Sequence, residues 1–133
     1  MQGAQAENKN RGIGRYSLSL VKSIVKNSKE HEIILALNAS FKDSVESIRY
    51  EFKDLLSQNN IRVWRTEHKN NYLNPEDVAR SKIPEATFEA FILAQLPDFI
   101  LITSLFEGLV DDAVTSVKAT YSSVPVSVIL YDL

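Results

Sequence analysis

Amphipathic stretches alternate with short apolar runs along this chain. In the first stretch, residues 13–27, apolar side chains recur three and four positions apart, the spacing of one helix face. They are Ile13, Tyr16, Leu20 and Ile24, with Val21 and Val25 beside them. The run that follows, residues 32–37 (EIILAL), is typical of a strand buried on both faces of a parallel sheet.

The same alternation continues to the end of the chain. Ser40 to Asp43 resembles a capping box and predicts a helix that ends near Ser57. The segment Asn74-Pro75-Glu76-Asp77 predicts another helix start, and Pro84 is expected to interrupt that helical region. The other predicted elements are strands at 61–64, 99–102 and 124–130, a helix at 85–96 with Phe88, Phe91 and Ile92 facing inward, and a helix from Asp112 to about 120.

Regular alternation of helices with apolar strands predicts an α/β fold, with a Rossmann-like, mostly parallel sheet and helices on both faces. Such sheets bind ligands beyond the carboxyl ends of their strands, where the strand order reverses. The glycine turn before the first helix, Asn38, the 103–112 loop and Tyr131-Asp132 would all lie at that edge.

Length, charge and composition limit the classes of protein to which this chain can belong. With 133 residues the chain is one domain, or part of one, with a sizeable core. Its net charge of −2 does not indicate nucleic-acid binding, and the lack of cysteine excludes disulfides and thiolate chemistry. No apolar run approaches the length of a membrane span, and residues 1–10 have no signal-peptide core. A reducing, cytoplasmic location fits these features.

Two glycines stand at the start of the first predicted helix, in Arg11-Gly12-Ile13-Gly14-Arg15-Tyr16. Glycine allows a backbone to approach a ligand closely, and a helix N-terminus offers free N–H groups and a positive dipole end to an anion. We therefore predict that Gly12 and Gly14 contact a phosphate and that Arg15 adds charge. A tight turn without a ligand is the simpler interpretation, because two glycines are a weak signal.

Taken in order, several motifs resemble glycosyltransferases of the GT-B fold, in the large retaining group that includes bacterial mannosyltransferases. The glycine segment, with Gln2-Gly3 ahead of it, is similar to the turn after their first strand. The segment Thr103-Ser104-Leu105-Phe106-Glu107-Gly108, then Asp111-Asp112, looks like the loop after their fourth strand. The last residues, Ile129-Leu130-Tyr131-Asp132-Leu133, are similar to their strand ending in His-Asp-Leu, with Tyr131 in place of His.

This resemblance implies that residues 1–133 are a truncated N-terminal Rossmann-like domain of a two-domain glycosyltransferase whose C-terminal domain is missing. The enzyme would move a sugar, mannose by the resemblance, from a nucleotide-diphosphate sugar to a glycan or lipid-linked acceptor. Neither a metal nor a cofactor is implied. The location would be cytoplasmic or peripheral at the inner face of the membrane. The fragment alone is expected to be inactive, because one domain supplies only half of the cleft.

The resemblance also implies roles for individual residues. Gly12, Gly14 and Arg15 would contact the donor diphosphate, while Tyr131 and Asp132 would contact the donor sugar. Tyr131 keeps a hydroxyl donor but lacks the titrating imidazole of the usual His.

The acceptor would be bound by Glu107 and Gly108.

Structural roles remain open for the same residues. Arg15 is equally a solvated helix residue or an ion-pair partner, Asp132 a turn cap, and Glu107 a hydrogen-bond acceptor within its loop. Asp111 and Asp112 could form a metal pair, but a helix cap at Asp112 is simpler. His31 and His68 have no partner constellation and are expected at the surface.

Two other functions compete with a glycosyltransferase. A Rossmann-type nucleotide- or dinucleotide-binding module without transferase activity needs a third glycine and an acid after the second strand, but Ser17 and Asn38 occupy those places. A receiver-type signalling domain needs an acidic cluster at strand ends, where only Asp132 is suitably placed.

The predicted sheet lacks its central first strand, which nothing before Gln2 supplies. An empty central position would leave two rows of backbone groups unpaired. We expect the strand at 32–37 to close up and pair directly with the strand at 99–102. The alternatives are an oligomer in which a segment of another chain fills the incomplete sheet, and a longer folded protein of which this chain is a fragment.

Overall fold

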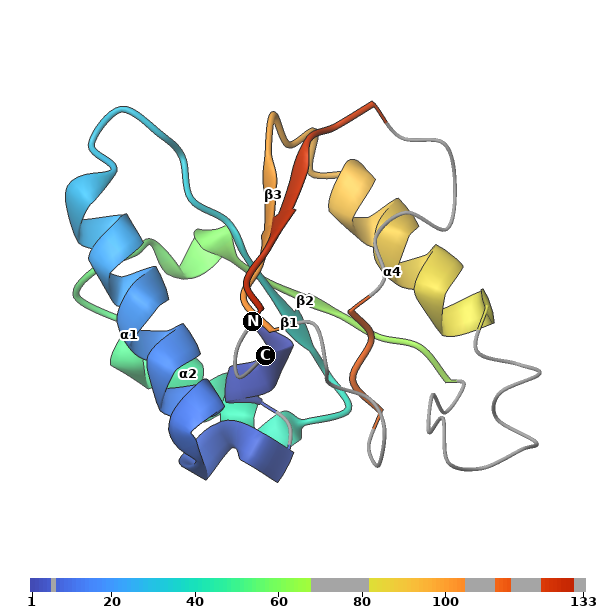
Figure 1. The fold of residues 1–133 in the computed structure, drawn as a ribbon, viewed down its shortest axis with the longest axis horizontal. Coiled ribbons are helices and arrows are strands. Elements are labelled where there is room, and N and C mark those ends of the chain that lie inside the picture. The colour runs from blue at the N-terminus through green and yellow to red at the C-terminus, as the bar shows by residue number, and fades with distance from the viewer. Residues whose placement is uncertain (6, 68–81, 105–111, 116–122, 131–133) are drawn as a thin grey trace.

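The computed structural model describes residues 1–5, 7–67, 82–104, 112–115 and 123–130 (Figure 1). Its helices are α1 (Gly12–Asn27), α2 (Lys42–Glu51) and α4 (Lys82–Leu93), and the short 3-10 turns are η1 (Gln2–Ala4), η2 (Glu7–Asn10) and η3 (Gln58–Asn60). The strands are β1 (Leu35–Asn38), β2 (Ile61–Trp64), β3 (Ile100–Ile102) and β4 (Val126–Val128). The predicted helix start at Asn74-Pro75 lies outside the described residues.

All described strand pairs are parallel, which confirms the predicted α/β class. In the first pair β1 lies beside β2, with Leu35 opposite Ile61 and Asn38 opposite Trp64. In the second pair β3 lies beside β4, with Ile100 opposite Val126. A connection through a helix joins β1 to β2, as parallel pairing requires.

Helices cover both faces of β1. Because successive strand residues point to opposite faces, Leu35 and Leu37 pack with α1 and α2, whereas Ala36 packs on the other side with α4. The core on the α1 side centres on the fully buried Phe52. On the α4 side Trp64 stacks on Phe88 with ring centroids 4.9 Å apart. The chain is therefore a three-layer, Rossmann-like arrangement.

Two helix starts differ from the predictions. Ser40 does not cap α2, because Phe41 takes the N-cap position. The backbone N–H of Ser40 donates instead to the Asn38 side chain at 2.9 Å. The predicted helix at Asp112 is also wrong for residues 112–115, which are not helical. There the side-chain amide of Gln2 holds both the N–H and the C=O of Val114, so these groups are engaged outside any helix.

The sequence predicts which helices and strands form more accurately than it predicts the residues at which they begin and end. Helix α2 ends at Glu51, and turns follow the buried Phe52 to residue 56. Helix α4 runs through Pro84, which lies near its first described residue, where a missing N–H costs little. It ends at Leu93, and Leu96 beyond it has a φ of 52°. Phe88 is buried and Phe91 and Ile92 pack against the same core, as predicted.

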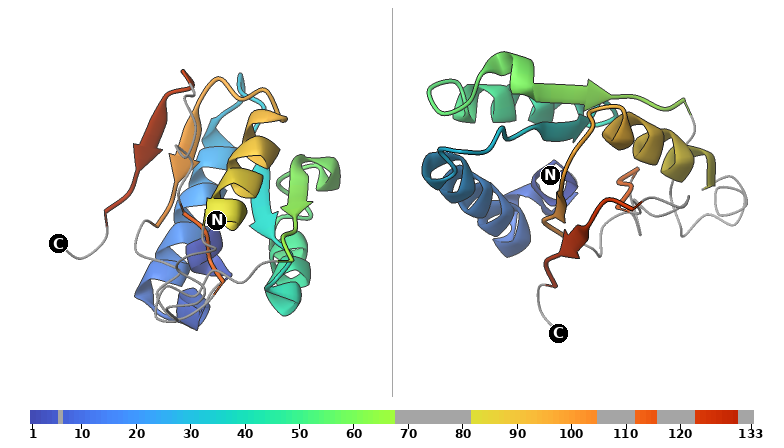
Figure 2. Two further views of the ribbon diagram at one scale, coloured as in Figure 1. Left: turned by 90° about the vertical axis from the view of Figure 1, so that its right-hand side faces the viewer. Right: turned by 90° about the horizontal axis from the view of Figure 1, so that it is seen from above.

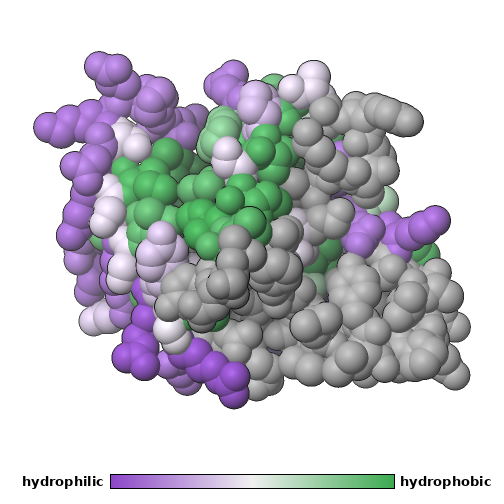
Figure 3. Space-filling model, in the orientation of Figure 1, coloured by the Kyte–Doolittle hydropathy of each residue, from purple (hydrophilic) through white to green (hydrophobic). Residues whose placement is uncertain are grey.

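The two strand pairs do not form one continuous sheet, so the predicted direct pairing of residues 32–37 with 99–102 is wrong. The amino terminus lies between the pairs in both views of Figure 2, and the Met1 amino group donates to the Ala36 carbonyl at 3.4 Å. Residues 32–34 stay outside β1, which begins only where Ile61 provides a partner. Hydrophobic atoms gather at this opening, between α1 and the β3–β4 pair (Figure 3).

Candidate functional site

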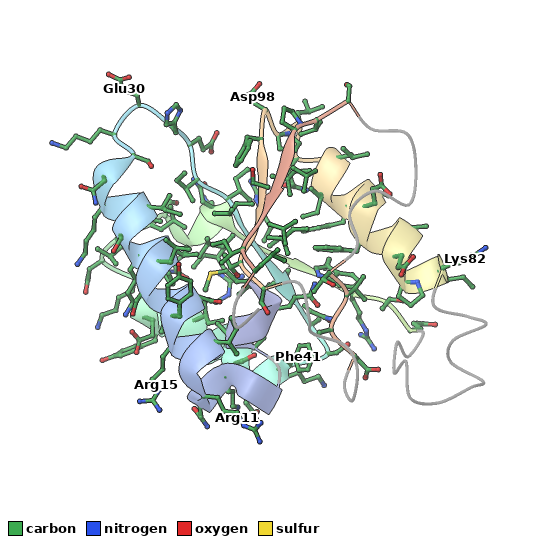
Figure 4. All side chains as sticks on the ribbon, viewed as in Figure 1. Arg11, Arg15, Glu30, Phe41, Lys82 and Asp98 are labelled. Carbon is green, nitrogen blue, oxygen red and sulfur yellow. The ribbon has the colours of Figure 1, made fainter. Side chains whose placement is uncertain are left out.

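The first turn of α1 lies at the same end of the molecule as Phe41, which follows β1, and far from Glu30 and Asp98 at the opposite end (Figure 4). The glycine segment and the segment that follows β1 therefore lie at the same end of the molecule, as predicted. Tyr131, Asp132, Glu107 and Gly108 lie outside the described residues, so their predicted roles remain predictions.

The glycines occupy the first turn of α1. Arg11 is the N-cap residue, in an extended conformation and without a side-chain cap, so the N–H groups of the first turn receive no side-chain hydrogen bond from it. Gly12 is exposed and Gly14 is buried. Arg15 is exposed, and its backbone N–H closes the first turn onto the Arg11 carbonyl at 3.1 Å. An anion therefore has access at Gly12, whereas burial gives Gly14 a packing reason to be glycine.

Ser17 stands one turn further along α1, where a dinucleotide fingerprint has its third glycine. It is fully buried, and its hydroxyl donates to the backbone carbonyl of Thr103 at 3.2 Å. This bond fixes α1 against the carboxyl end of β3. The side chain at this position thus performs a structural task that a glycine could not.

A buried network of side-chain amides connects the elements at this edge. Gln5 pairs with the backbone of Asn38: its Nε2 donates to the Asn38 carbonyl at 3.1 Å, and its Oε1 accepts from the Asn38 N–H at 2.8 Å. Gln2 holds Val114 in the same two-point manner, and its Oε1 also accepts from the Asn38 side chain at 3.3 Å. Asn38 Nδ2 donates further to the Asp112 carbonyl at 3.0 Å.

Sequence reasoning placed Asn38 at this edge but treated Gln2 and Gln5 as part of a polar loop. The available signal was a pair of glutamines three residues apart, just before a predicted helix. A long amide side chain can satisfy a backbone donor with its oxygen and a backbone acceptor with its nitrogen. Burial of such an amide costs little free energy, because its polar atoms pair with backbone groups that would otherwise lack hydrogen-bond partners.

A pocket of about 790 Å³ opens beyond the carboxyl ends of β1 and β2. Its polar lining carries hydroxyls, carboxylates and cations from α2, the segment after β2 and the segment containing Asp112. These side chains are Ser40, Thr66, Glu46, Glu67, Asp112, Lys42 and Arg65. Donors and acceptors of this density suit a polyhydroxylated ligand, whose hydroxyls can donate to the three carboxylates and accept from the two cations.

No three His, Cys, Asp or Glu side chains among the described residues are grouped to hold a metal ion. His31 is exposed, as predicted, and His68 lies outside the described residues. Within the part of the chain that the structure describes, no helix has the length and apolar character needed to cross a bilayer.

Comparison with known proteins found similarity to mannosyltransferases. The chain is 29% identical over 120 residues to a serotype-specific mannosyltransferase WbdA of Escherichia coli, an alignment that spans 90% of this chain and 14% of that protein. A second WbdA from E. coli is 25% identical over 99 residues, or 74% of this chain and 12% of the relative. No family model matches, and no solved structure matches. The chain is thus similar to a small part of a mannosyltransferase.

Proposed function

We propose that this chain is the acceptor-side, N-terminal part of a retaining mannosyltransferase of the GT-B type. The observation that carries the proposal is similarity to WbdA along 90% of the chain. Exposed Gly12 and an N-terminus without a side-chain cap support a role in contacting the donor diphosphate.

The pocket beyond β1 and β2 would bind the acceptor. Sugar hydroxyls both donate and accept hydrogen bonds, so a lining with Ser40, Thr66 and neighbouring carboxylates can hold several of them at once. Arg65 would contribute a fixed cation with several donors. By holding the acceptor hydroxyl in position toward the donor, this one domain would contribute to the rate of sugar transfer.

Transfer itself requires charge stabilisation in a closed cleft, which we assign to a second domain. The 133-residue chain alone should therefore bind but not transfer. Mannose transfer by the purified chain above a heat-inactivated control would contradict this assignment.

Nuclear magnetic resonance of the ¹⁵N-labelled chain tests the binding proposal. Mannose disaccharides should shift the amide signals of Ser40 and Arg65, and GDP-mannose should shift that of Gly12. Arg65→Ala should reduce the disaccharide shifts, whereas the matched variant Arg62→Ala should not, because Arg62 is an exposed residue of β2 that does not line the pocket. Shifts caused by NAD, with none caused by mannosides, would favour the dinucleotide-binding module instead.

The dinucleotide alternative has weaker support. Its third glycine is replaced by the buried Ser17, and the acid that would bind a ribose is replaced by Asn38, whose side chain and backbone are engaged in the amide network. Neither residue is available to a ligand.

A further inference from the structure

Two walls of the pocket proposed for the acceptor are joined by one buried side chain. One wall is the turn after β1, which contributes Ser40, and the other is the segment that contributes Asp112. Asn38, the last residue of β1, is fully buried and does not line the pocket. Its Oδ1 accepts from the backbone N–H of Ser40 at 2.9 Å, and its Nδ2 donates to the backbone carbonyl of Asp112 at 3.0 Å. A single amide group therefore contacts the backbone of both walls.

The second hydrogen of the Asn38 amide strengthens the hold on the Asp112 wall. Nδ2 also donates to Gln2 Oε1 at 3.3 Å, and the same oxygen accepts from the backbone N–H of Val114 at 2.6 Å. Gln2 Nε2 in turn donates to the Val114 carbonyl. Residues 112–115 form neither a helix nor a strand, so these two amides hold the Asp112 wall through side-chain contacts.

The position of Asn38 requires a side chain that donates and accepts hydrogen bonds at the same time. An aspartate there would keep the acceptor for Ser40 but would turn a second oxygen toward the Asp112 carbonyl. If β1 needed only a buried side chain at this point, an apolar residue would serve, as Leu35 and Leu37 do earlier in the strand. The contacts with the two walls therefore account for asparagine at the end of β1.

We propose that Asn38 is a positioning residue for the acceptor pocket. Its side-chain amide fixes the turn at Ser40 and the segment at Asp112 relative to each other, so that a saccharide contacts both walls without first ordering them. Walls that are in place before the ligand arrives lower the entropic cost of binding. This role rests on the proposed acceptor site and determines its shape, although Asn38 itself touches no ligand atom.

The variant Asn38→Asp tests the proposal, because it removes the donor to Asp112 and Gln2 and keeps the acceptor for Ser40. In a titration of the ¹⁵N-labelled chain, a mannose disaccharide should bind the variant about five- to ten-fold more weakly than the unmodified chain. At saturation, the shift of the Asp112 amide signal should shrink relative to that of the Ser40 amide, because the Asp112 wall is the one released. A general loss of stability would leave this ratio of shifts unchanged.

The variant Gln5→Glu is the matched control. It removes a hydrogen bond from the same buried network, at the backbone carbonyl of Asn38, but leaves every contact of the Asn38 side chain in place. Urea denaturation of both variants measures how much stability each has lost. At disaccharide concentrations that saturate the unmodified chain, Gln5→Glu should bind nearly as tightly as that chain and keep its ratio of Asp112 to Ser40 shifts.

A second measurement uses the unmodified chain and does not depend on the folding of any variant. The two Nδ2 protons of Asn38 should exchange slowly with solvent, because both are hydrogen-bonded and the side chain is buried. Their signals should shift when the disaccharide binds, although Asn38 does not line the pocket. The side-chain amide of the exposed Gln58, which precedes β2 at its amino end, should not shift.

Three results would overturn the role of Asn38 and leave the acceptor site in place. They are unchanged disaccharide affinity in Asn38→Asp, an equal loss of affinity in Gln5→Glu, and an unchanged ratio of the Asp112 and Ser40 shifts. If Asn38→Asp does not fold, unshifted side-chain signals of Asn38 in the unmodified chain would overturn the role. A disaccharide that shifts neither Ser40 nor Asp112 in the unmodified chain would overturn the acceptor site itself, and the role of Asn38 with it.

Discussion

The side-chain amide of Gln5 pairs with the backbone of Asn38 as an adjacent strand would, accepting from its N–H at 2.8 Å and donating to its C=O at 3.1 Å. Asn38 is the last residue of β1 and is fully buried. Its inner-edge groups would otherwise be unpaired, because β2 lies on the opposite side. The relationship explains how the end of β1 remains stable although a strand pairs with only one of its edges among the described residues.

Replacing Gln5 with Glu should therefore destabilise the fold by about 1–3 kcal/mol, the usual cost of leaving buried polar groups without a donor. The carboxylate keeps the size of the side chain but cannot donate to the Asn38 carbonyl or to Ser44. Urea denaturation measures the change. Gln58→Glu is the matched control at an exposed position and should cost less than about 0.5 kcal/mol.

The strands could be predicted because their signal is carried by contiguous apolar residues, as at 61–64, where prediction and structure agree. Helix starts were less predictable, because Ser40 and Asp112 have helix-capping side chains but are both held by the Asn38 side chain. Its contact with Ser40 is local, whereas its contact with Asp112 joins residues distant in sequence. The closure of the sheet was predicted wrongly for the same reason. Local patterns do not reveal that the amides of Gln2 and Gln5 can satisfy strand ends from a loop.

The stacked pair Trp64–Phe88 should be a main support of the α4 layer. Phe88 is 7% exposed, and its ring joins α4 to the end of β2. Phe88→Ala should lower the free energy of unfolding by about 3–5 kcal/mol, since it leaves a cavity in the core. Phe99→Ala is the matched control, because Phe99 is 55% exposed and should cost much less. Equal losses of stability in the two variants would show that α4 is not anchored by this pair.

The two glycines of α1 should respond differently to valine. Gly14 is buried, so Gly14→Val should destabilise the fold by about 1–3 kcal/mol through overpacking. Gly12 is exposed, so Gly12→Val should leave the melting temperature nearly unchanged but weaken the binding of GDP-mannose. Thermal denaturation and ligand titration of both variants separate packing from ligand contact. If Gly12→Val binds GDP-mannose as the unmodified chain does, the glycines serve only the turn.

Stability should depend on the protonation of the Met1 amino group. Burial lowers its pKa from 8.0 to about 6, because desolvation disfavours the charged form. Between these two values the unfolded chain binds more protons than the folded chain, so the free energy of unfolding should rise as the pH increases from 6 to 8. Above pH 8 the amine is neutral in both states and below pH 6 it is charged in both, so its contribution becomes constant.

At about 1.4 kcal/mol per pKa unit, the gain across this window is at most roughly 3 kcal/mol. Urea denaturation at pH 6 and pH 8 measures the gain, and Nα-acetylation of Met1 is the control, because it removes the titrating group and leaves both histidines in place. The acetylated chain should lose most of the rise in stability between pH 6 and 8. The same rise in both forms would mean that the amino group is solvated and that other groups cause the dependence. A smaller rise in the acetylated chain would locate a desolvated amine beside the Ala36 carbonyl.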